Sequence, residues 1–378
     1  RSRRPLPSTG LELPLRGLGL LAIALALLSL GLVILSSASL YRGEALHGDP
    51  THFLAHQGVG VALGLIALVA ASQVHPRWWL RAAPLLYGGV VGLLLLVLLT
   101  DLAVSRNSAS RWIAFGPIQF QPSELAKPAL PLLLVWFSLR LGSPGGARGV
   151  RRLLLVLPQA LAVLLVSVLV AVEPDYGTAF FLLLIAAAVL ILEGLPWSCL
   201  GAGGLLLSGP ALYAFLERRE LVIERFLALF DPEAIYQVRH SLFAIGSGGL
   251  LGKGFGLGVE KNLLLPAEYN DFIFAVYAEE TGWLGVLILL GLFSGLLQCG
   301  FRIARECPSP PLRLLAFAFL FNILVQAIIN IAVATASAPT KGISLPFISY
   351  GSSGLVVLLF EVGVLVAIAR IRREGGPP

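Results

Sequence analysis

The sequence is dominated by long apolar runs, and a helix needs about 20 such residues to cross a bilayer. Only 13% of its residues are charged and the mean hydropathy is +0.87, which excludes a water-soluble globular protein. The sequence therefore predicts an all-α polytopic membrane protein, a single domain over residues 1–378 with ten transmembrane helices. The predicted spans are 17–40, 54–74, 79–100, 123–141, 153–172, 177–193, 197–216, 271–298, 312–337 and 353–370.

The positions of the arginines indicate the side of the membrane on which each connection lies. Cytoplasmic segments are enriched in Lys and Arg, so both termini are predicted to be cytoplasmic, in agreement with an even number of spans. The excess of basic residues, a net charge of +6, is thus explained by membrane topology, and no nucleic-acid partner is expected. Arginines gather in the N-terminal tail (Arg1, Arg3, Arg4, Arg16), in alternate connections (Arg77, Arg81; Arg140, Arg148, Arg151, Arg152; Arg302, Arg305, Arg313) and at the C-terminus (Arg370, Arg372, Arg373).

The other connections should face outward, and the longest of them is an extracytoplasmic loop at about 217–270. Its glycine-rich stretch 246–258 would either present backbone N–H groups to a phosphate or serve only as a flexible connection. His240 and Ser241 precede this stretch, and Lys253 lies within it. A lone histidine does not define a metal ligand.

Two shorter outward segments carry polar groups at helix starts. Glu124 and Lys127 are three residues apart, so they can share a helix face close to Arg111. A binding role and a plain helix-start ion pair are both open for them. Asp175 most simply caps the helix that follows it.

Asp271 lies where the long polar loop turns into a very apolar helix. Partial burial at this rim of the bilayer would raise the pKa of Asp271 toward values useful for proton abstraction. The simpler interpretation makes Asp271 only the N-cap of that helix. Glu280 falls on the opposite face of the same helix.

Two prolines in segment 339–354 exclude a continuous helix, although the segment is apolar enough to enter the membrane. Non-helical backbone is tolerated there only where protein or a water-filled cavity satisfies it. Lys341, Ser349, Ser352 and Ser353 would then line that cavity. An ordinary short loop is the alternative.

Five outward segments together resemble the SEDS family (shape, elongation, division and sporulation; FtsW, RodA and SpoVE). They read SRWIAFGPIQFQPSELAK, EPDYGTA, HSLFAIGSGGLLGKGFG, LPAEYNDFIFAVYAEETG and PTKGISLPFISYGSSG, in this order between residues 110 and 354. PTKG looks more like the division branch, FtsW, than the elongation branch. The chain has His-Ser at 240–241 where the family usually has Gln-Ser, Tyr-Asn-Asp at 269–271 where it has His-Thr-Asp, and Gly-Ser-Ser-Gly at 351–354 where it has Gly-Gly-Ser-Ser.

The resemblance implies a peptidoglycan glycosyltransferase that polymerises lipid II at the outer face of the bacterial cytoplasmic membrane, with Asp271 as general base. It also implies a class B penicillin-binding transpeptidase as partner, with other divisome or elongasome membrane proteins. A divalent cation, Mg²⁺ or Mn²⁺, is a candidate helper with unknown ligands. The expected substrate-binding residues are Arg111, Glu124, Lys127, His240, Ser241, Lys253, Lys341, Ser349, Ser352 and Ser353.

Two other functions fit a polytopic protein of this kind. A lipid II flippase or transporter would explain Glu280 and Glu361 inside spans, although no internal repeat is present and most charge lies at the outward rim. A membrane scaffold for a cell-wall transpeptidase is compatible with the enzyme as well as an alternative to it.

Overall fold

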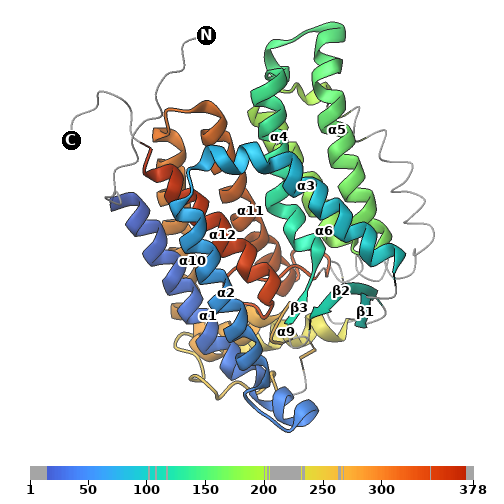
Figure 1. Ribbon diagram of the computed structural model, residues 1–378. Coiled ribbons are helices and arrows are strands. Elements are labelled where there is room, and N and C mark those ends of the chain that lie inside the picture. The colour runs from blue at the N-terminus through green and yellow to red at the C-terminus, as the bar shows by residue number, and fades with distance from the viewer. Residues whose placement is uncertain are drawn as a thin grey trace.

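The computed structural model describes residues 15–371 except 101–102, 107–108, 116–117, 200, 202–203, 205–230, 232–234, 263–264, 267 and 341. Within these ranges the chain is mostly helical (Figure 1). The helices are α1 (Leu15–His47), α2 (His52–Gln73), α3 (Pro76–Leu99), α4 (Pro122–Leu141), the short η1 (Pro144–Gly146), α5 (Gly149–Val172), α6 (Tyr176–Leu192), α9 (Tyr236–Ser247), α10 (Ile273–Glu306), α11 (Pro310–Ala334) and α12 (Ser352–Ala369).

Seven of the described helices are long and apolar enough to cross a membrane, namely α1, α2, α3, α5, α10, α11 and α12. This confirms a polytopic helical membrane protein. Helices α4 and α6 coincide with the predicted spans 123–141 and 177–193. Most of the predicted span 197–216 and part of the loop 217–270 lie outside the described residues.

A small antiparallel sheet corrects the all-α prediction. It joins β1 (Ala103–Arg106), β2 (Ala109–Phe115) and β3 (Ile118–Phe120) in the order β1-β2-β3. The three strands occupy the connection before α4 and are only three to seven residues long. Strand pairing satisfies backbone groups that a loop would leave to solvent, and strands this short form no apolar run of span length in the sequence.

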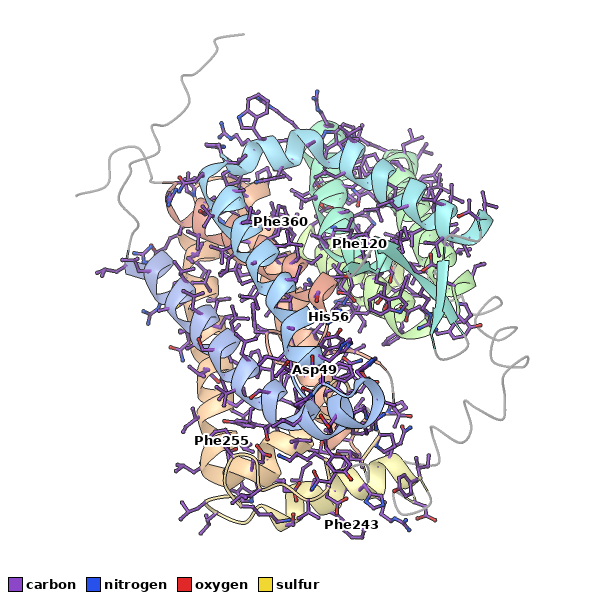
Figure 2. All side chains as sticks on the ribbon, turned by 60° about the horizontal axis from the view of Figure 1, so that its bottom comes forward. Asp49, His56, Phe120, Phe243, Phe255 and Phe360 are labelled. Atoms are coloured by element: carbon purple, nitrogen blue, oxygen red, sulfur yellow. The ribbon has the colours of Figure 1, made fainter. Side chains whose placement is uncertain are left out.

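Two apolar cores divide the bundle. One is formed mainly by α1, α10, α11 and α12, and the other by α3, α4, α5 and α6. Helix α4 contacts both α11 and α12 and so joins the two cores. Near this junction, Phe360 of α12 packs edge-on against Trp79 of α3, with 4.9 Å between ring centroids (Figure 2).

Helices α2 and α12 approach each other closely because glycines line their contact. A Cβ atom at Gly363 would lie 2.4 Å from the carbonyl oxygen of Leu68, and one at Gly60 would lie 2.7 Å from Cβ of Ser352. Only glycine fits either position without a shift of the backbone. This contact fixes the N-terminal end of α12, where the predicted serines lie.

Helix α10 is broken at Gly282, whose φ of 64° is not helical. The glycine-rich stretch packs against the break, with Lys253 N donating to the carbonyl oxygen of Glu279 (3.0 Å) and Trp283 N donating to that of Gly249 (3.0 Å). Gly252 is required there, because a Cβ would lie 2.1 Å from the carbonyl oxygen of Glu280. The stretch therefore uses backbone groups to bind α10, rather than acting as a slack connection.

The connections α2–α3, α4–α5 and α10–α11 lie at one end of the bundle, at the top of Figure 1. The small sheet, α9 and the α1–α2 connection lie at the other end. We call these the arginine end and the sheet end. The division agrees with the alternation of charge along the sequence.

Candidate active site

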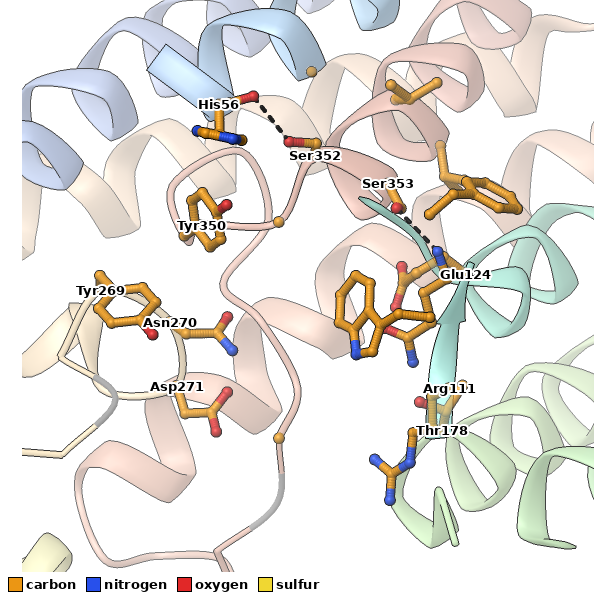
Figure 3. A pocket seen from close by; sticks show the side chains of 18 of the residues that line it. His56, Arg111, Glu124, Thr178, Tyr269, Asn270, Asp271, Tyr350, Ser352 and Ser353 are labelled. Atoms are coloured by element: carbon orange, nitrogen blue, oxygen red, sulfur yellow. Dashed lines mark hydrogen bonds between the residues drawn. The ribbon is translucent and has the colours of Figure 1, made fainter. Parts of the chain in front are cut away.

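A cavity of about 560 Å³ opens at the sheet end, between segments that belong to the two cores (Figure 3). Five parts of the chain line it: the α1–α2 junction, the sheet with the start of α4, the turn before α6, and the two segments around residues 270 and 350. Its polar lining includes His47, His52, His56, Arg111, Gln121, Glu124, Asp175, Thr178, Tyr269, Asn270, Asp271, Tyr350, Ser352 and Ser353.

Asp271 lines this cavity and is partly buried. Helix α10 begins at Ile273 with Phe272 as its N-cap, so the interpretation of Asp271 as the N-cap is wrong. A Cβ atom at Gly342 would lie 3.5 Å from Oδ2 of Asp271, which places the carboxyl group beside the segment between α11 and α12.

The backbone around Asp271 is held from two sides. Asn330 of α11 donates from Nδ2 to the carbonyl oxygens of Asp271 (3.0 Å) and Ile343 (2.8 Å). Ser349 donates from Oγ to the carbonyl oxygen of Asn270 at 2.7 Å. The segment after α11 is non-helical, and its apolar residues pack into the first core, as predicted for a segment that enters the bundle.

Arg111 and Asp271 lie on opposite sides of the cavity in Figure 3. Arg111 on β2 donates to the carbonyl oxygens of Glu173 (2.8 Å) and Pro174, and its guanidinium lies 3.9 Å from Asp175. Asp175 accepts from the backbone N–H of Thr178 at 3.2 Å, which confirms the predicted cap of α6. Arg111 therefore ties the sheet to the turn before α6.

The predicted ion pair between Lys127 and Glu124 is confirmed, with 2.7 Å between Nζ and Oε1. Glu124 lines the cavity, whereas Lys127 is 4% exposed and lies behind it. Ser353 accepts from the backbone N–H of Gln121, and Ser352 donates to the carbonyl oxygen of His56, both at 3.2 Å (Figure 3). The two serines join α12 to α4 and α2 at the cavity wall.

Four of the remaining expected binding residues do not line the cavity, namely Lys253, His240, Ser241 and Ser349. Lys253 pairs with Glu279 at 2.6 Å, and His240 lies 2.6 Å from Glu260. Ser241 donates to the carbonyl oxygen of Ala334 at 2.7 Å. Ser349 supports the backbone next to Asp271, as described above, and Lys341 lies outside the described residues.

Three histidines of the cavity were missed from the sequence. His47 and His52 stack with 3.7 Å between ring centroids, and His56 follows one turn later on α2. A signal was present, since three of the five histidines in the chain fall within residues 47–56. Their spacing across a helix junction gave no indication that they line the same cavity as Asp271.

Burial raises the pKa of Glu173 to about 8, with a further rise from Asp175 and a partial offset from Arg111. Burial also raises the pKa of Glu268, against the lowering effect of Arg42 at 2.6 Å. Among the residues that the structure describes, no three His, Cys, Asp or Glu side chains are grouped as a metal site.

The fold and this cavity define a class of protein: a helical membrane protein with a carboxylate and an arginine in a polar chamber at one end of its bundle. The FtsW/RodA/SpoVE family model, described as a cell cycle protein, matches residues 18–374. The chain therefore belongs to the SEDS family, as the sequence motifs predicted.

Relatives of known name cover most of the chain. The peptidoglycan glycosyltransferase MrdB of Escherichia coli K12 is 36% identical over 83% of this chain and 84% of its own length. A probable peptidoglycan glycosyltransferase FtsW of Halorhodospira halophila is 35% identical over 91% of this chain and 89% of its own length.

Solved structures agree with this assignment. Thermus thermophilus RodA superposes with a TM-score of 0.68 at 32% identity, covering 93% of this chain and 96% of that one. A second solved structure is a chain of a peptidoglycan synthase complex described as coordinating polymerisation and crosslinking. It superposes with a TM-score of 0.74 at 30% identity, covering 93% of this chain and 97% of that one.

Proposed function

We propose that this protein is a peptidoglycan glycosyltransferase that polymerises lipid II. The observation that carries the proposal is the Asp271 carboxyl group, which lines an open polar cavity across from Arg111. Its relatives are named as peptidoglycan glycosyltransferases, and the aspartate lies in the motif that carries the family resemblance. Composition, fold and site are consistent with this one chemistry.

In the proposed reaction, Asp271 takes the proton from the 4-hydroxyl of the acceptor N-acetylglucosamine as this oxygen attacks C1 of the donor. The bond from C1 to the undecaprenyl pyrophosphate breaks in the same displacement, so the configuration at C1 changes from α to β. Pyrophosphate needs little protonation to leave, and one carboxylate therefore suffices. Arg111 is the described cation of the cavity lining that would stabilise the departing charge.

We further propose that the bundle contains ten spans and a long extracytoplasmic loop, with both termini cytoplasmic in the bacterial inner membrane. The support is that the connections α2–α3, α4–α5 and α10–α11, which carry arginines, lie at one end of the bundle, whereas the segments that line the cavity lie at the other. The sugars would then enter at the outer face while the prenyl tail stays in lipid.

We also propose that a divalent cation assists the reaction. The described residues contain no three-ligand metal group, so a Mg²⁺ or Mn²⁺ ion would take most of its ligands from pyrophosphate and water. For partners we propose a class B penicillin-binding transpeptidase and other divisome or elongasome membrane proteins. The PTKG motif is the support for the division branch.

The decisive experiment compares wild type with Asp271→Ala and Asp271→Asn in polymerisation of purified lipid II, with and without the transpeptidase. We expect glycan strands from wild type and a loss of at least about 100-fold in both variants, since an acid–base group contributes about 10²–10⁴-fold. Full activity in a folded variant would remove Asp271 as the base. Vesicles that translocate labelled lipid II and form no strands would support a flippase instead.

A further inference from the structure

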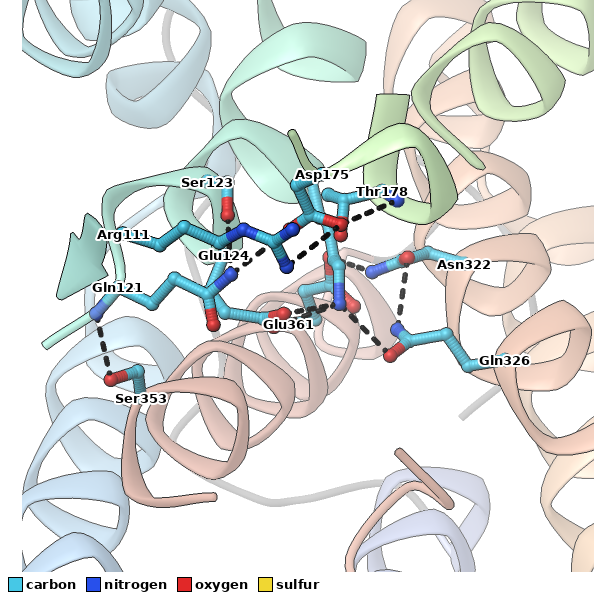
Figure 4. Close-up of polar contacts among 11 residues, drawn as sticks. Arg111, Gln121, Ser123, Glu124, Asp175, Thr178, Asn322, Gln326, Ser353 and Glu361 are labelled. Carbon is cyan, nitrogen blue, oxygen red and sulfur yellow. Dashed lines mark hydrogen bonds and ion pairs between the residues drawn. The ribbon is translucent and has the colours of Figure 1, made fainter. Parts of the chain in front are cut away.

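Five polar side chains form a continuous chain from the cavity wall into the centre of the bundle (Figure 4). Lys127 donates from Nζ to both carboxylate oxygens of Glu124 (2.7 and 2.8 Å) and to Oε1 of Gln326 (3.2 Å). Gln326 donates from Nε2 to Oδ1 of Asn322 at 3.1 Å, and Asn322 donates from Nδ2 to Oε1 of Glu361 at 2.6 Å. The chain crosses from α4 through α11 to α12.

Only the Glu124 end of this chain reaches the cavity. Gln326 is 2% exposed, and Asn322 and Glu361 are fully buried. Glu361 lies nine residues beyond Ser352, which is about 13 Å along α12. Burying a carboxyl group this deep costs free energy unless a hydrogen-bond partner compensates it. Asn322 is that partner for Glu361.

The direction of the hydrogen bonds gives Glu361 a specific effect. Its Oε1 accepts, so the amide of Asn322 must turn its nitrogen toward Glu361 and its oxygen toward Gln326. Gln326 must then turn its own oxygen toward Lys127. Without an acceptor at position 361 the Asn322 amide loses the bond that fixes its orientation, and Lys127 alone then orients Gln326. A flipped Gln326 would present N–H groups to the Lys127 cation.

We propose that Glu361 is a positioning residue for the cavity. Through Asn322 and Gln326 it fixes Lys127, and through Lys127 it holds the Glu124 carboxylate at the cavity wall in its binding orientation. Amide side chains orient charges and do not pass protons along the chain, so Glu361 acts by geometry. This inference rests on the polymerase function proposed above.

The test measures kcat and KM for lipid II with Glu361→Gln, Glu361→Leu and Gln326→Leu. Glu361→Gln keeps an accepting oxygen and should stay within about threefold of wild type. Glu361→Leu and Gln326→Leu should lose at least about tenfold in kcat/KM, since small displacements of a binding group cost rate steeply. Gln159→Leu is the matched control, because Gln159 is equally buried but contacts Glu193, remote from the cavity.

The proposal is overturned if Glu361→Leu retains activity within threefold, or if Gln159→Leu loses as much as Glu361→Leu at equal thermal stability. Gln326→Leu decides the question if Glu361→Leu does not fold. If the wild-type protein forms no glycan strands, the polymerase function is rejected but the role of Glu361 is not. The role of Glu361 is then tested by carbodiimide labelling of Glu124, measured by mass spectrometry. The labelling should rise severalfold in Glu361→Leu and Gln326→Leu. Unchanged labelling would reject the role of Glu361.

Discussion

At the scale of single residues, the site depends on how each charge is balanced. Arg111, Lys127 and Lys253 are among the substrate-binding residues expected from the sequence, and the structure places Arg111 at the cavity wall. Lys127 and Lys253 are instead committed to Glu124 and Glu279. Buried charges of this kind need partners, because desolvation costs several kcal/mol per ion.

Glu173 gives a prediction for stability against pH. Its pKa is raised to about 8 in the folded protein, so it stays protonated there while the unfolded chain loses the proton above about 4.5. The contribution of Glu173 to the free energy of unfolding is therefore complete below about pH 4.5 and is lost as the pH rises through 8. Thermal unfolding of wild type should therefore shift downward between pH 6 and 9, and Glu173→Gln should reduce this shift by roughly 5 °C.

The control for that measurement is Glu44→Gln, which changes an exposed glutamate of α1. It should leave the pH dependence as in wild type. Parallel curves for wild type and Glu173→Gln would contradict the assigned pKa.

At the scale of elements, the broken helix α10 and the stretch around Gly252 stabilise each other. The carboxylate of Glu279 accepts from Nζ of Lys253 (2.6 Å) and from the backbone N–H of Val259 (2.9 Å). Lys261 contacts Glu280 at 2.5 Å in the same region. These pairs fasten the loop to the helix whose first turn follows Asp271.

Lys253→Met should destabilise the protein by about 1–3 kcal/mol, because Glu279 is fully buried and would lose its cation. The double variant Lys253→Met/Glu279→Gln should recover part of that stability in thermal unfolding. If the double variant is stable yet binds lipid II much more weakly than wild type, Lys253 has the substrate-binding role expected from the sequence.

The contact between α2 and α12 gives a second prediction at this scale. Gly363→Ala should lower the free energy of unfolding by about 1–3 kcal/mol, because its Cβ would clash with the Leu68 carbonyl. Gly92→Ala on α3 meets nothing within 4 Å and should instead raise it by up to about 1 kcal/mol. Equal effects of the two changes would show that α12 can move away from α2.

At the scale of the whole molecule, two apolar cores meet under one cavity, and the arginine-bearing connections lie at the opposite end. This arrangement lets separate halves of the bundle each bring one wall to the substrate. The proposed orientation puts the sheet end on the extracytoplasmic side of the membrane.

Cysteine labelling in spheroplasts tests that orientation after Cys199, Cys299 and Cys307 are changed to serine. Asp49→Cys at the sheet end should react with a membrane-impermeant maleimide in intact spheroplasts. Arg148→Cys at the arginine end should react only after permeabilisation. The reverse pattern would place the cavity in the cytoplasm.

The sequence by itself determined the features that depend on near neighbours. Nine predicted spans coincide with α1–α6 and α10–α12, because apolar length is a local property. The ion pair of Glu124 with Lys127 and the cap at Asp175 also follow from spacing within one turn. The resemblance to the SEDS family also made Asp271 the expected base, and Asp271 lines the cavity.

Only the tertiary structure decided which distant groups meet. It brought Asp271 to the cavity that Arg111 lines, paired Lys253 with Glu279, and connected Glu361 to Glu124 through α11. Apolar spans can pack side by side in many orders, and the order is settled by close contacts such as those at Gly60 and Gly363. The need to pair a buried charge is written in the sequence, but the identity of its partner depends on that packing.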